Sequence, residues 1–178
     1  MPAKLQGAIA LKKAMRQFTP DLAKETNKEI ASFVRPLAKK ARGFMPSNDA
    51  APSGWLKRDN AKGRWATRYY DASEARRGIS YKTSAGRANS RGFRSLASIQ
   101  SKNIGGIIYE WAGRASGITG NFTPKLEAIS QLRGKNKGMT GRALYRAYAK
   151  DEGKATAGVI KAMEKAAAKF NARKTILK

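Results

Sequence analysis

The side chains of this sequence that can do chemistry are overwhelmingly those of lysine and arginine. Its 178 residues include 37 Lys or Arg but only 12 Asp or Glu, which gives a formal net charge of +25. Cys and His are both absent, so the chain has no thiolate nucleophile and lacks the commonest general base and metal ligand. We therefore expect no catalytic, metal-binding or cofactor-binding residues, and a function that rests on binding.

The basic residues are concentrated where acids are missing. No Asp or Glu lies between Glu74 and Glu110, or anywhere in residues 128–150. Such runs attract phosphate groups without sequence preference and in a salt-dependent way. We expect a flexible arm over residues 76–94 to face DNA or an acidic neighbour; a solvated, solubilising face is the alternative. The residues predicted to face the anion are Arg76, Arg77, Lys82, Arg87, Arg91 and Arg94, and the second stretch adds Arg133, Lys135, Lys137, Arg142, Arg146 and Lys150.

Aromatic side chains are interleaved with these arginines. Tyr69, Tyr70 and Tyr81 all lie near Arg residues in the sequence, an arrangement that suits stacking of single-stranded bases. In alternating strands, however, aromatic residues more often pack across neighbouring strands. We favour the packing interpretation.

Three helices are predicted from apolar residues at spacings of three and four. One runs from Leu5 to Phe18, and a second begins at Thr19-Pro20-Asp21, contains Pro36 and ends at Gly43. The third, near the C-terminus, carries Val159, Met163, Ala166 and Phe170 on one stripe, of which we expect Met163 and Phe170 to be buried.

Strands are predicted in the middle of the chain. Residues 65–70, 79–83 and 97–101 alternate with period two. Glycine-rich and proline-rich segments at 43–63, 84–92 and 112–141 predict extended loops or arms, with a short helix starting at Thr123-Pro124. Trp55, in the first loop, either anchors the chain to a neighbour or folds back onto its own core.

These elements predict the fold class. We expect a single α+β domain over residues 1–178, in which the N-terminal helices and the C-terminal helix pack on a small antiparallel sheet with long extended loops. Leu, Ile, Val and Phe make up only about 16% of the chain, which is low for a chain that folds alone. No run of about 18 apolar residues predicts a transmembrane helix, so we expect the protein in a cytoplasm or in a particle assembled there.

One segment resembles a known family. Gly106-Ile107-Ile108-Tyr109-Glu110-Trp111-Ala112-Gly113 follows a polar strand and precedes a glycine-rich loop. It is similar to the aromatic-Glu-aromatic-Gly signature of the bacteriophage tail-completion, or head–tail joining, proteins of long-tailed phages. The helix that runs into Gly43-Phe44-Met45-Pro46, the segment 141–147 and the closing helix over 151–171 are similar to that family in position and kind.

The resemblance implies a structural role. The resemblance implies a virion neck protein that is assembled in the host cytoplasm. It would form a six-fold ring between tail terminator and head connector, around the DNA channel. The residues then predicted at subunit contacts are Trp55, Tyr109, Glu110, Trp111 and Gly113. Glu110 would pair with an arginine or cap local amides; a solvent-facing helix position is its alternative. The rival function is a cellular basic nucleic-acid-binding protein of ribosome-associated or nucleoid type.

Overall fold

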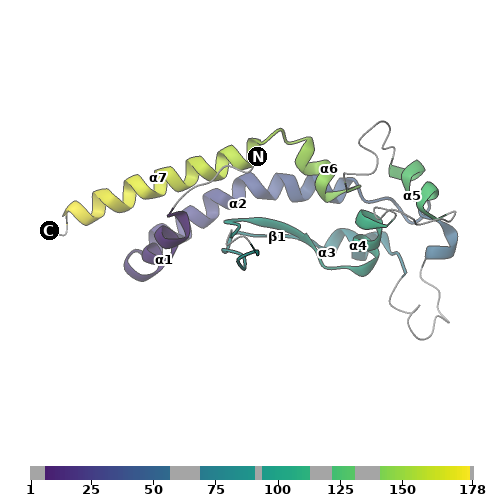
Figure 1. Ribbon diagram of the computed structural model, residues 1–178, viewed down its shortest axis with the longest axis horizontal. Coiled ribbons are helices and arrows are strands. Elements are labelled where there is room, and N and C mark those ends of the chain that lie inside the picture. Colours follow the sequence, from purple (N-terminus) through teal and green to yellow (C-terminus); the bar gives the residue numbers. More distant parts are fainter. Residues whose placement is uncertain (1–6, 57–68, 91–93, 113–121, 131–140, 177–178) are drawn as a thin grey trace. The chain divides into compact units, whose positions relative to one another are not determined.

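The computed structural model describes all of the chain except residues 1–6, 57–68, 91–93, 113–121, 131–140 and 177–178. Helices dominate these described residues: two of them are long and the others are short, and one small sheet accompanies them (Figure 1). The elements are α1 (Ala8–Phe18), α2 (Pro20–Gly43), a 3-10 turn η1 (Ser53–Trp55), α3 (Ala72–Gly78), β1 (Ile79–Lys82), β2 (Ser98–Ser101), α4 (Ile104–Trp111), α5 (Phe122–Ser130), α6 (Leu144–Ala149) and α7 (Lys154–Ile176).

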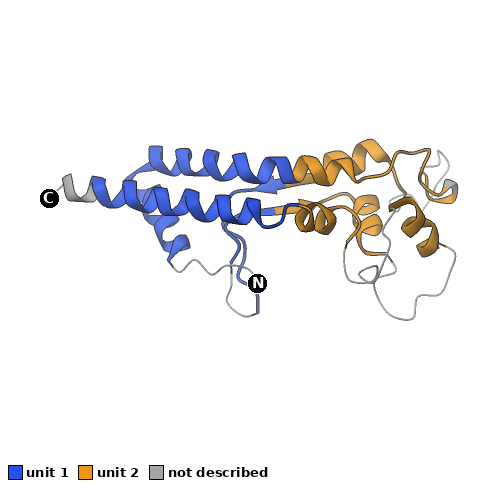
Figure 2. Cartoon of the chain, turned by 90° about the horizontal axis from the view of Figure 1, so that it is seen from above, with its two compact units in different colours: residues 1–37, 81–98, 151–178 blue, residues 38–80, 99–150 orange. Residues whose placement is uncertain are grey.

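The α+β class is confirmed, with helices flanking a small two-stranded antiparallel sheet. The chain forms two compact units, shown in different colours in Figure 2. Unit 1 comprises residues 1–37, 81–98 and 151–178, and unit 2 comprises residues 38–80 and 99–150. The organisation as a single domain stays a prediction.

The predicted N-terminal helices are confirmed. α1 ends at Phe18, and Thr19 separates it from α2, which starts at Pro20. Proline suits this first helical position because the amide it lacks has no partner there, and Asp21 in the same turn favours the positive end of the helix dipole. Pro36 lies inside α2 without ending it, and the helix continues to Gly43 as predicted.

Unit 1 is built on the pairing of α2 with α7, which run alongside each other in Figure 1. Three ion pairs join them, and each step of four along α2 matches a step of four back along α7, as an antiparallel pair of helices requires. The Arg173 guanidinium donates to Asp21 at 2.7 Å and the Lys165 ammonium to Glu29 at 3.1 Å; Lys169 donates to Glu25. These hydrogen bonds lower the pKa of Asp21 and the pKa of Glu25 below the usual range.

Small residues on α7 allow this close pairing. Ala162 and Ala166 are buried beside Met163, and a Cβ atom on Gly158 would collide with the Phe33 ring of α2. The burial predicted for Met163 is therefore confirmed, whereas that predicted for Phe170 is wrong, because Phe170 is only half-buried. Helices that approach through alanine and glycine leave the larger Phe170 side chain at the margin of their contact.

Unit 1 also buries a lysine. Lys12 of α1 is only 6% exposed, and its Nζ donates to the Thr83 carbonyl oxygen at 2.5 Å. Burial, followed by the repulsion of nearby Arg16, lowers the pKa of Lys12 to about 8. The hydrogen bond ties α1 to the residue that follows β1.

Two of the three predicted strands are confirmed as β1 and β2. Outside them, the Lys102 amide donates to the Gly78 carbonyl oxygen at 3.0 Å, and the Gly86 amide donates to that of Ser95 at 2.9 Å. Most of the third predicted strand lies outside the described residues; within it, Tyr70 forms an isolated bridge with Leu56.

Helix α3 was not expected, and it corrects the prediction of a flexible arm over 76–94. Arg76 and Arg77 belong to its last turn. The helix begins where the Asp71 side chain accepts a hydrogen bond from the Glu74 amide at 2.8 Å, a capping interaction that satisfies one of the unpaired first-turn donors. The first predicted loop also contains η1. The last contains α5, which confirms the short helix predicted to start at Thr123-Pro124, and its Leu126 is fully buried.

Candidate functional site

The segment that carries the family resemblance forms α4, and its buried face points into unit 2. The Asn103 side chain caps this helix by accepting from the Gly106 amide at 2.9 Å. Tyr109 and Glu110 are each only 1% exposed. A carboxylate buried this completely must be matched by donors to be tolerated.

Backbone amides supply those donors. Glu110 Oε2 accepts from the amides of Ala143 at 2.7 Å and Leu144 at 3.1 Å, and Oε1 accepts from that of Tyr145 at 3.1 Å. These residues open α6, where the first amides have no partner within the helix and the dipole favours negative charge. Capping of local amides, one of the roles predicted for Glu110, is therefore confirmed, and the solvent-facing alternative is wrong.

A glycine and a buried arginine complete this Glu110 cap. A Cβ atom on Gly141 would collide with the Glu110 carboxylate, so only glycine leaves room for the cap. Arg142 is fully buried, and its Nη1 donates to the Tyr109 carbonyl oxygen at 2.7 Å. Arg146 donates to the Ser130 carbonyl oxygen at 2.7 Å and lies over the Phe44 ring at 4.4 Å. Both arginines were predicted on a phosphate-seeking surface; instead they brace unit 2, because carbonyl groups and aromatic rings hold their guanidinium groups.

The opposite side of the cap is apolar and exposed. Trp111 and Tyr145 meet edge to face with ring centroids 5.3 Å apart. On α4 the exposed side chains recur at spacings of three and four, and those on α6 are three apart, so each set occupies one helix face. We call the five residues the α4–α6 stripe; they are Ile104 (46% exposed), Ile107 (40%), Trp111 (51%), Tyr145 (48%) and Tyr148 (52%).

The other residues predicted at subunit contacts lie elsewhere. Trp55 is 7% exposed and packs against Tyr70 at 4.7 Å and Phe122 at 5.2 Å between ring centroids, so it folds back onto the core of its own unit. Tyr109 is likewise buried inside unit 2. Gly113 lies outside the described residues. Of the predicted set, the structure leaves Trp111 exposed and uses Glu110 inside the unit.

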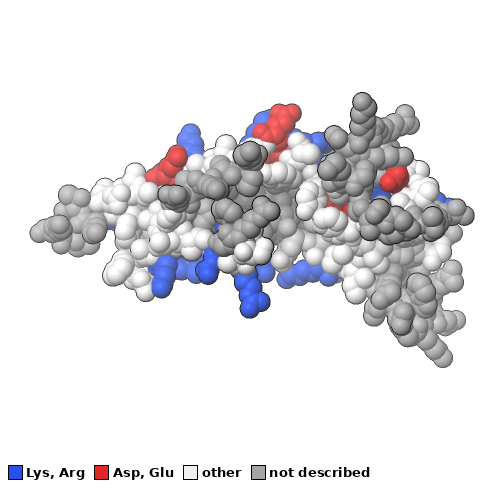
Figure 3. Space-filling model, viewed as in Figure 1, with Lys and Arg blue, Asp and Glu red and all other residues white. Residues whose placement is uncertain are grey.

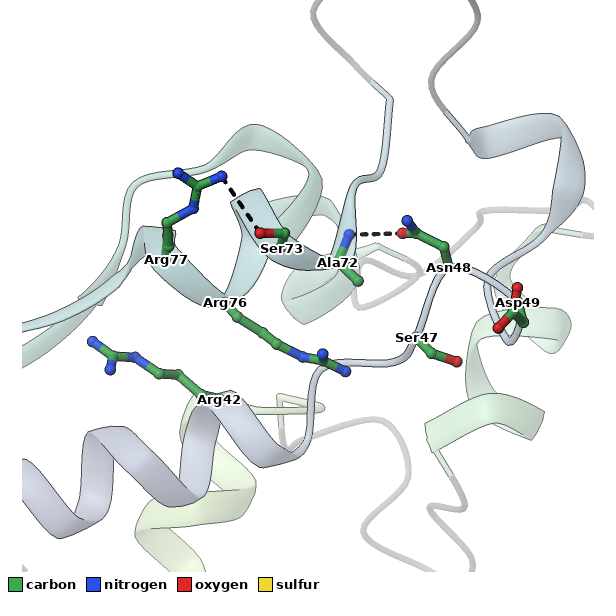
Figure 4. Close-up of a pocket in the computed structure, with 8 residues that line it drawn as sticks. All are labelled: Arg42, Ser47, Asn48, Asp49, Ala72, Ser73, Arg76 and Arg77. Atoms are coloured by element: carbon green, nitrogen blue, oxygen red, sulfur yellow. Dashed lines mark hydrogen bonds between the residues drawn. The ribbon is translucent and has the colours of Figure 1, made fainter.

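A second feature of unit 2 is an open cleft beside α3, with a volume of about 740 Å³ (Figure 4). The last turn of α2, the segment after it and α3 supply its walls. Arg76 extends from α3 toward the segment that carries Ser47, and Asn48 faces the start of α3. The lining residues are Arg42, Ser47, Asn48, Asp49, Ala72, Ser73, Arg76 and Arg77.

The remaining residues predicted to face an anion are spread along the chain. Lys82 ends β1, and Arg87 and Arg94 lie in the segment between the strands; all three are exposed, and Arg91 lies outside the described residues. In Figure 3, Lys and Arg side chains project from the lower edge of unit 1, the edge at which α1 lies in Figure 1. Arg76 and Arg77, which are also exposed, line the cleft of unit 2, whereas Lys82, Arg87 and Arg94 belong to unit 1.

Among the described residues, no three His, Cys, Asp or Glu side chains come together as metal ligands do. No helix in this part of the chain is long and apolar enough to cross a membrane. Comparisons with protein-family models, with curated protein sequences and with solved structures found no match to this chain.

Proposed function

We propose that this protein is a structural subunit of the virion neck of a long-tailed phage, which forms a ring that completes the tail and joins it to the head connector. The observation that carries the proposal is the double role of the segment around Glu110. Its buried side organises unit 2 through the Glu110 cap, and its other side presents Trp111 next to Tyr145. A signature segment that both builds the fold and exposes aromatic side chains suits a protein that assembles with copies of itself.

The α4–α6 stripe is the proposed subunit contact, and its occupant is a second copy of this chain. A surface helix usually presents polar residues on the face that does not meet the core. α4 instead has Tyr109 in the core and Ile104, Ile107 and Trp111 outside it. Exposed apolar side chains that form a continuous patch, with aromatic residues at its centre, are typical of protein interfaces.

Acids of both units bind groups within the protein, which supports an anionic partner for the exposed cations. In unit 1, Asp21, Glu25 and Glu29 pair with cations of α7, and Asp151 accepts from the Ala155 amide at 2.6 Å. In unit 2, Asp71 and Glu110 cap helices. Many lysines and arginines, in contrast, are exposed, among them Lys28, Lys39, Lys82, Arg87 and Arg94. This positive surface would face the DNA in the channel or acidic neighbours, the tail terminator and head connector.

The assembly can be tested with purified protein. Native mass spectrometry should show one defined oligomer. Electron microscopy should show a six-fold ring with a central channel. The Trp111→Ser, Tyr145→Ser variant should dissociate to smaller species with unchanged circular dichroism. Phe18→Ser is the matched control, because Phe18 is 75% exposed but lies outside the stripe. A monomeric wild-type protein, or an equal effect of the control, would overturn the proposal.

The second candidate is a cellular basic nucleic-acid-binding protein, which the exposed cations favour. Such a protein would coat DNA or RNA and give a broad distribution of particle sizes. It would show the same distribution for the wild-type protein and for the stripe variant. A defined ring without nucleic acid would exclude it in favour of the neck protein.

A further inference from the structure

The cleft of unit 2 holds arginine charge without neutralising it. Arg42 Nε and Nη2 both donate to the Ile79 carbonyl oxygen, at 3.1 and 2.7 Å. Arg76 Nη2 donates to the carbonyl oxygen of Met45 at 3.2 Å and to that of Pro46 at 3.5 Å. Carbonyl groups orient a guanidinium but carry no charge, and each arginine has five N–H donors. Both side chains are therefore tethered and still have donors for a ligand.

The polar side chains that line the cleft with the arginines also present donors. In Figure 4, Ser47 and Asn48 lie on the side toward which Arg76 extends, whereas the Arg42 guanidinium points the other way. The Ser47 hydroxyl oxygen accepts from the Ala50 amide at 3.3 Å, and the Ser73 hydroxyl oxygen accepts from Arg77 at 3.4 Å. The Asn48 side-chain oxygen accepts from the Ala72 amide at 2.7 Å, which directs its NH₂ group away from that contact. Since these oxygens act as acceptors inside the protein, the hydroxyl and amide hydrogens are what the cleft offers to a ligand.

The balance of charge in the cleft selects an anion. Its lining contains three arginines and a single acid, Asp49. Planar guanidinium groups combined with hydroxyl and amide donors match the several oxygens of a phosphate group. An open cleft, rather than an enclosed cavity, suits a phosphate that belongs to a long chain.

We propose that this cleft binds the backbone of a nucleic acid. Arg76, with the donors of Ser47, Asn48 and Ser73, holds one phosphate group, and Arg42 contacts another. The inference deepens the anion-facing part of the proposed function and rests on it for the identity of the ligand. It concerns none of the residues of the α4–α6 stripe, so phosphate binding and ring formation can fail separately.

The test measures binding of a short DNA duplex at several salt concentrations, with the Arg42→Gln, Arg76→Gln variant. The matched control is Lys102→Gln, Lys125→Gln, which removes the same charge from two exposed positions of unit 2 outside the cleft. Each phosphate contact contributes about 0.9 to the slope of log affinity against log salt. We expect the cleft variant to lower this slope by up to about two units, one for each phosphate contact that is lost, and the control to lower it by less. Equal slopes for the two variants would overturn the proposal.

A second measurement separates the two sources of phosphate. Inorganic phosphate should raise the melting temperature of the wild-type protein above that in chloride at the same ionic strength, and the cleft variant should lose this shift. If the cleft variant loses the phosphate-induced shift in melting temperature but binds DNA with the wild-type salt slope, the cleft binds free phosphate. That result would overturn the proposal of a nucleic-acid backbone as the ligand. Absence of the shift would overturn the site altogether.

Two further variants keep the test decisive, because Arg42 and Arg76 also tether the backbone. The Ser47→Ala, Ser73→Ala variant removes two hydroxyl donors and leaves the carbonyl contacts of both arginines intact. It should reduce the phosphate-induced shift in melting temperature by at least half, and it serves as the test if the Gln variant does not fold. Arg42→Lys, Arg76→Lys keeps the charge but loses the forked donors. Wild-type binding by either variant would show that diffuse charge, rather than this donor set, is responsible. Oligomer size measured on the same samples reports the ring independently.

Discussion

Two sets of carboxylates, one in each unit, lie in opposite settings. In unit 1, Asp21, Glu25 and Glu29 pair with cations of α7 on a surface that water reaches. In unit 2, Glu110 is removed from water and satisfied by three backbone amides. A solvated ion pair gains little because water competes for both partners, whereas loss of a buried carboxylate leaves its donors unpaired. Similar acids can therefore contribute very different amounts to the free energy of unfolding, depending on their burial and their partners.

The largest effect should come from Glu110→Ala. The substitution leaves three buried amides at the start of α6 without an acceptor. We therefore expect the free energy of unfolding to fall by about 3–5 kcal/mol. Chemical denaturation measures this. Glu164→Ala, at an exposed acid of α7, is the control and should change stability by less than about 0.5 kcal/mol. Similar costs for the two variants would remove the contrast between buried and solvated acids.

Gly158→Ala tests the close approach of α7 to α2 in unit 1. The added methyl group meets the Phe33 ring, and overpacking of this kind costs about 1–3 kcal/mol. Gly43→Ala is the control, because a Cβ atom there meets nothing within 4 Å. Thermal unfolding of both variants compares them, and a stabilised Gly158→Ala protein would show that Phe33 moves aside freely.

Lys12 should make stability depend on pH. Its pKa is lowered to about 8 by burial, whereas an unfolded lysine titrates near 10.4. The unfolded state therefore holds more protons between these values, and stability should rise with pH from about 8 upward. Burial raises the pKa of Tyr70, which opposes this rise only above about pH 10, where unfolded tyrosine ionises.

Lys12→Met should flatten the rise between pH 8 and 9.5. The measurement is the denaturation midpoint across that range, and Lys13→Met, one residue away and exposed, is the control. An unchanged slope in Lys12→Met would assign the pH dependence to other groups.

The smallest effect should belong to the ion pair between Glu29 and Lys165. A double-mutant cycle with alanine at both positions should give a coupling of about 0.2–1 kcal/mol, and it should shrink at high salt. A coupling energy above about 2 kcal/mol, or one that does not change with salt concentration, would contradict this expectation. The solvated pair would then stabilise the protein as strongly as a buried contact such as the Glu110 cap.

Local patterns in the sequence predict much of this fold. The stripes of α1, α2 and α7 and the alternation in β1 and β2 are periodic over enough residues to specify their elements. α3 was missed because its signal is a four-residue capping pattern, Asp71 to Glu74, inside a segment dominated by arginine. That pattern was visible, and it would have separated Arg76 and Arg77 from the proposed arm.

The candidate site depends on contacts that no local pattern contains. Glu110 meets residues 33 to 35 positions away, so the sequence supports several roles for it without choosing one. Arg142 is one of several basic residues in the acid-free segment 128–150, and nothing in the sequence marks it as the one that is fully buried. Trp55 is equally ambiguous, since its partners Tyr70 and Phe122 lie far along the chain.

The pairing of α2 with α7 also orders events during synthesis. More than a hundred residues separate the two helices, and translation at about 5–20 residues per second delays α7 by on the order of ten seconds. Until then Phe33 of α2, which lies against Gly158, has no α7 to cover it. During synthesis, unit 1 therefore stays incomplete until its last helix is made. If α7 of a second chain packed on α2 in that interval, the two chains would form a domain-swapped dimer that exchanges α7.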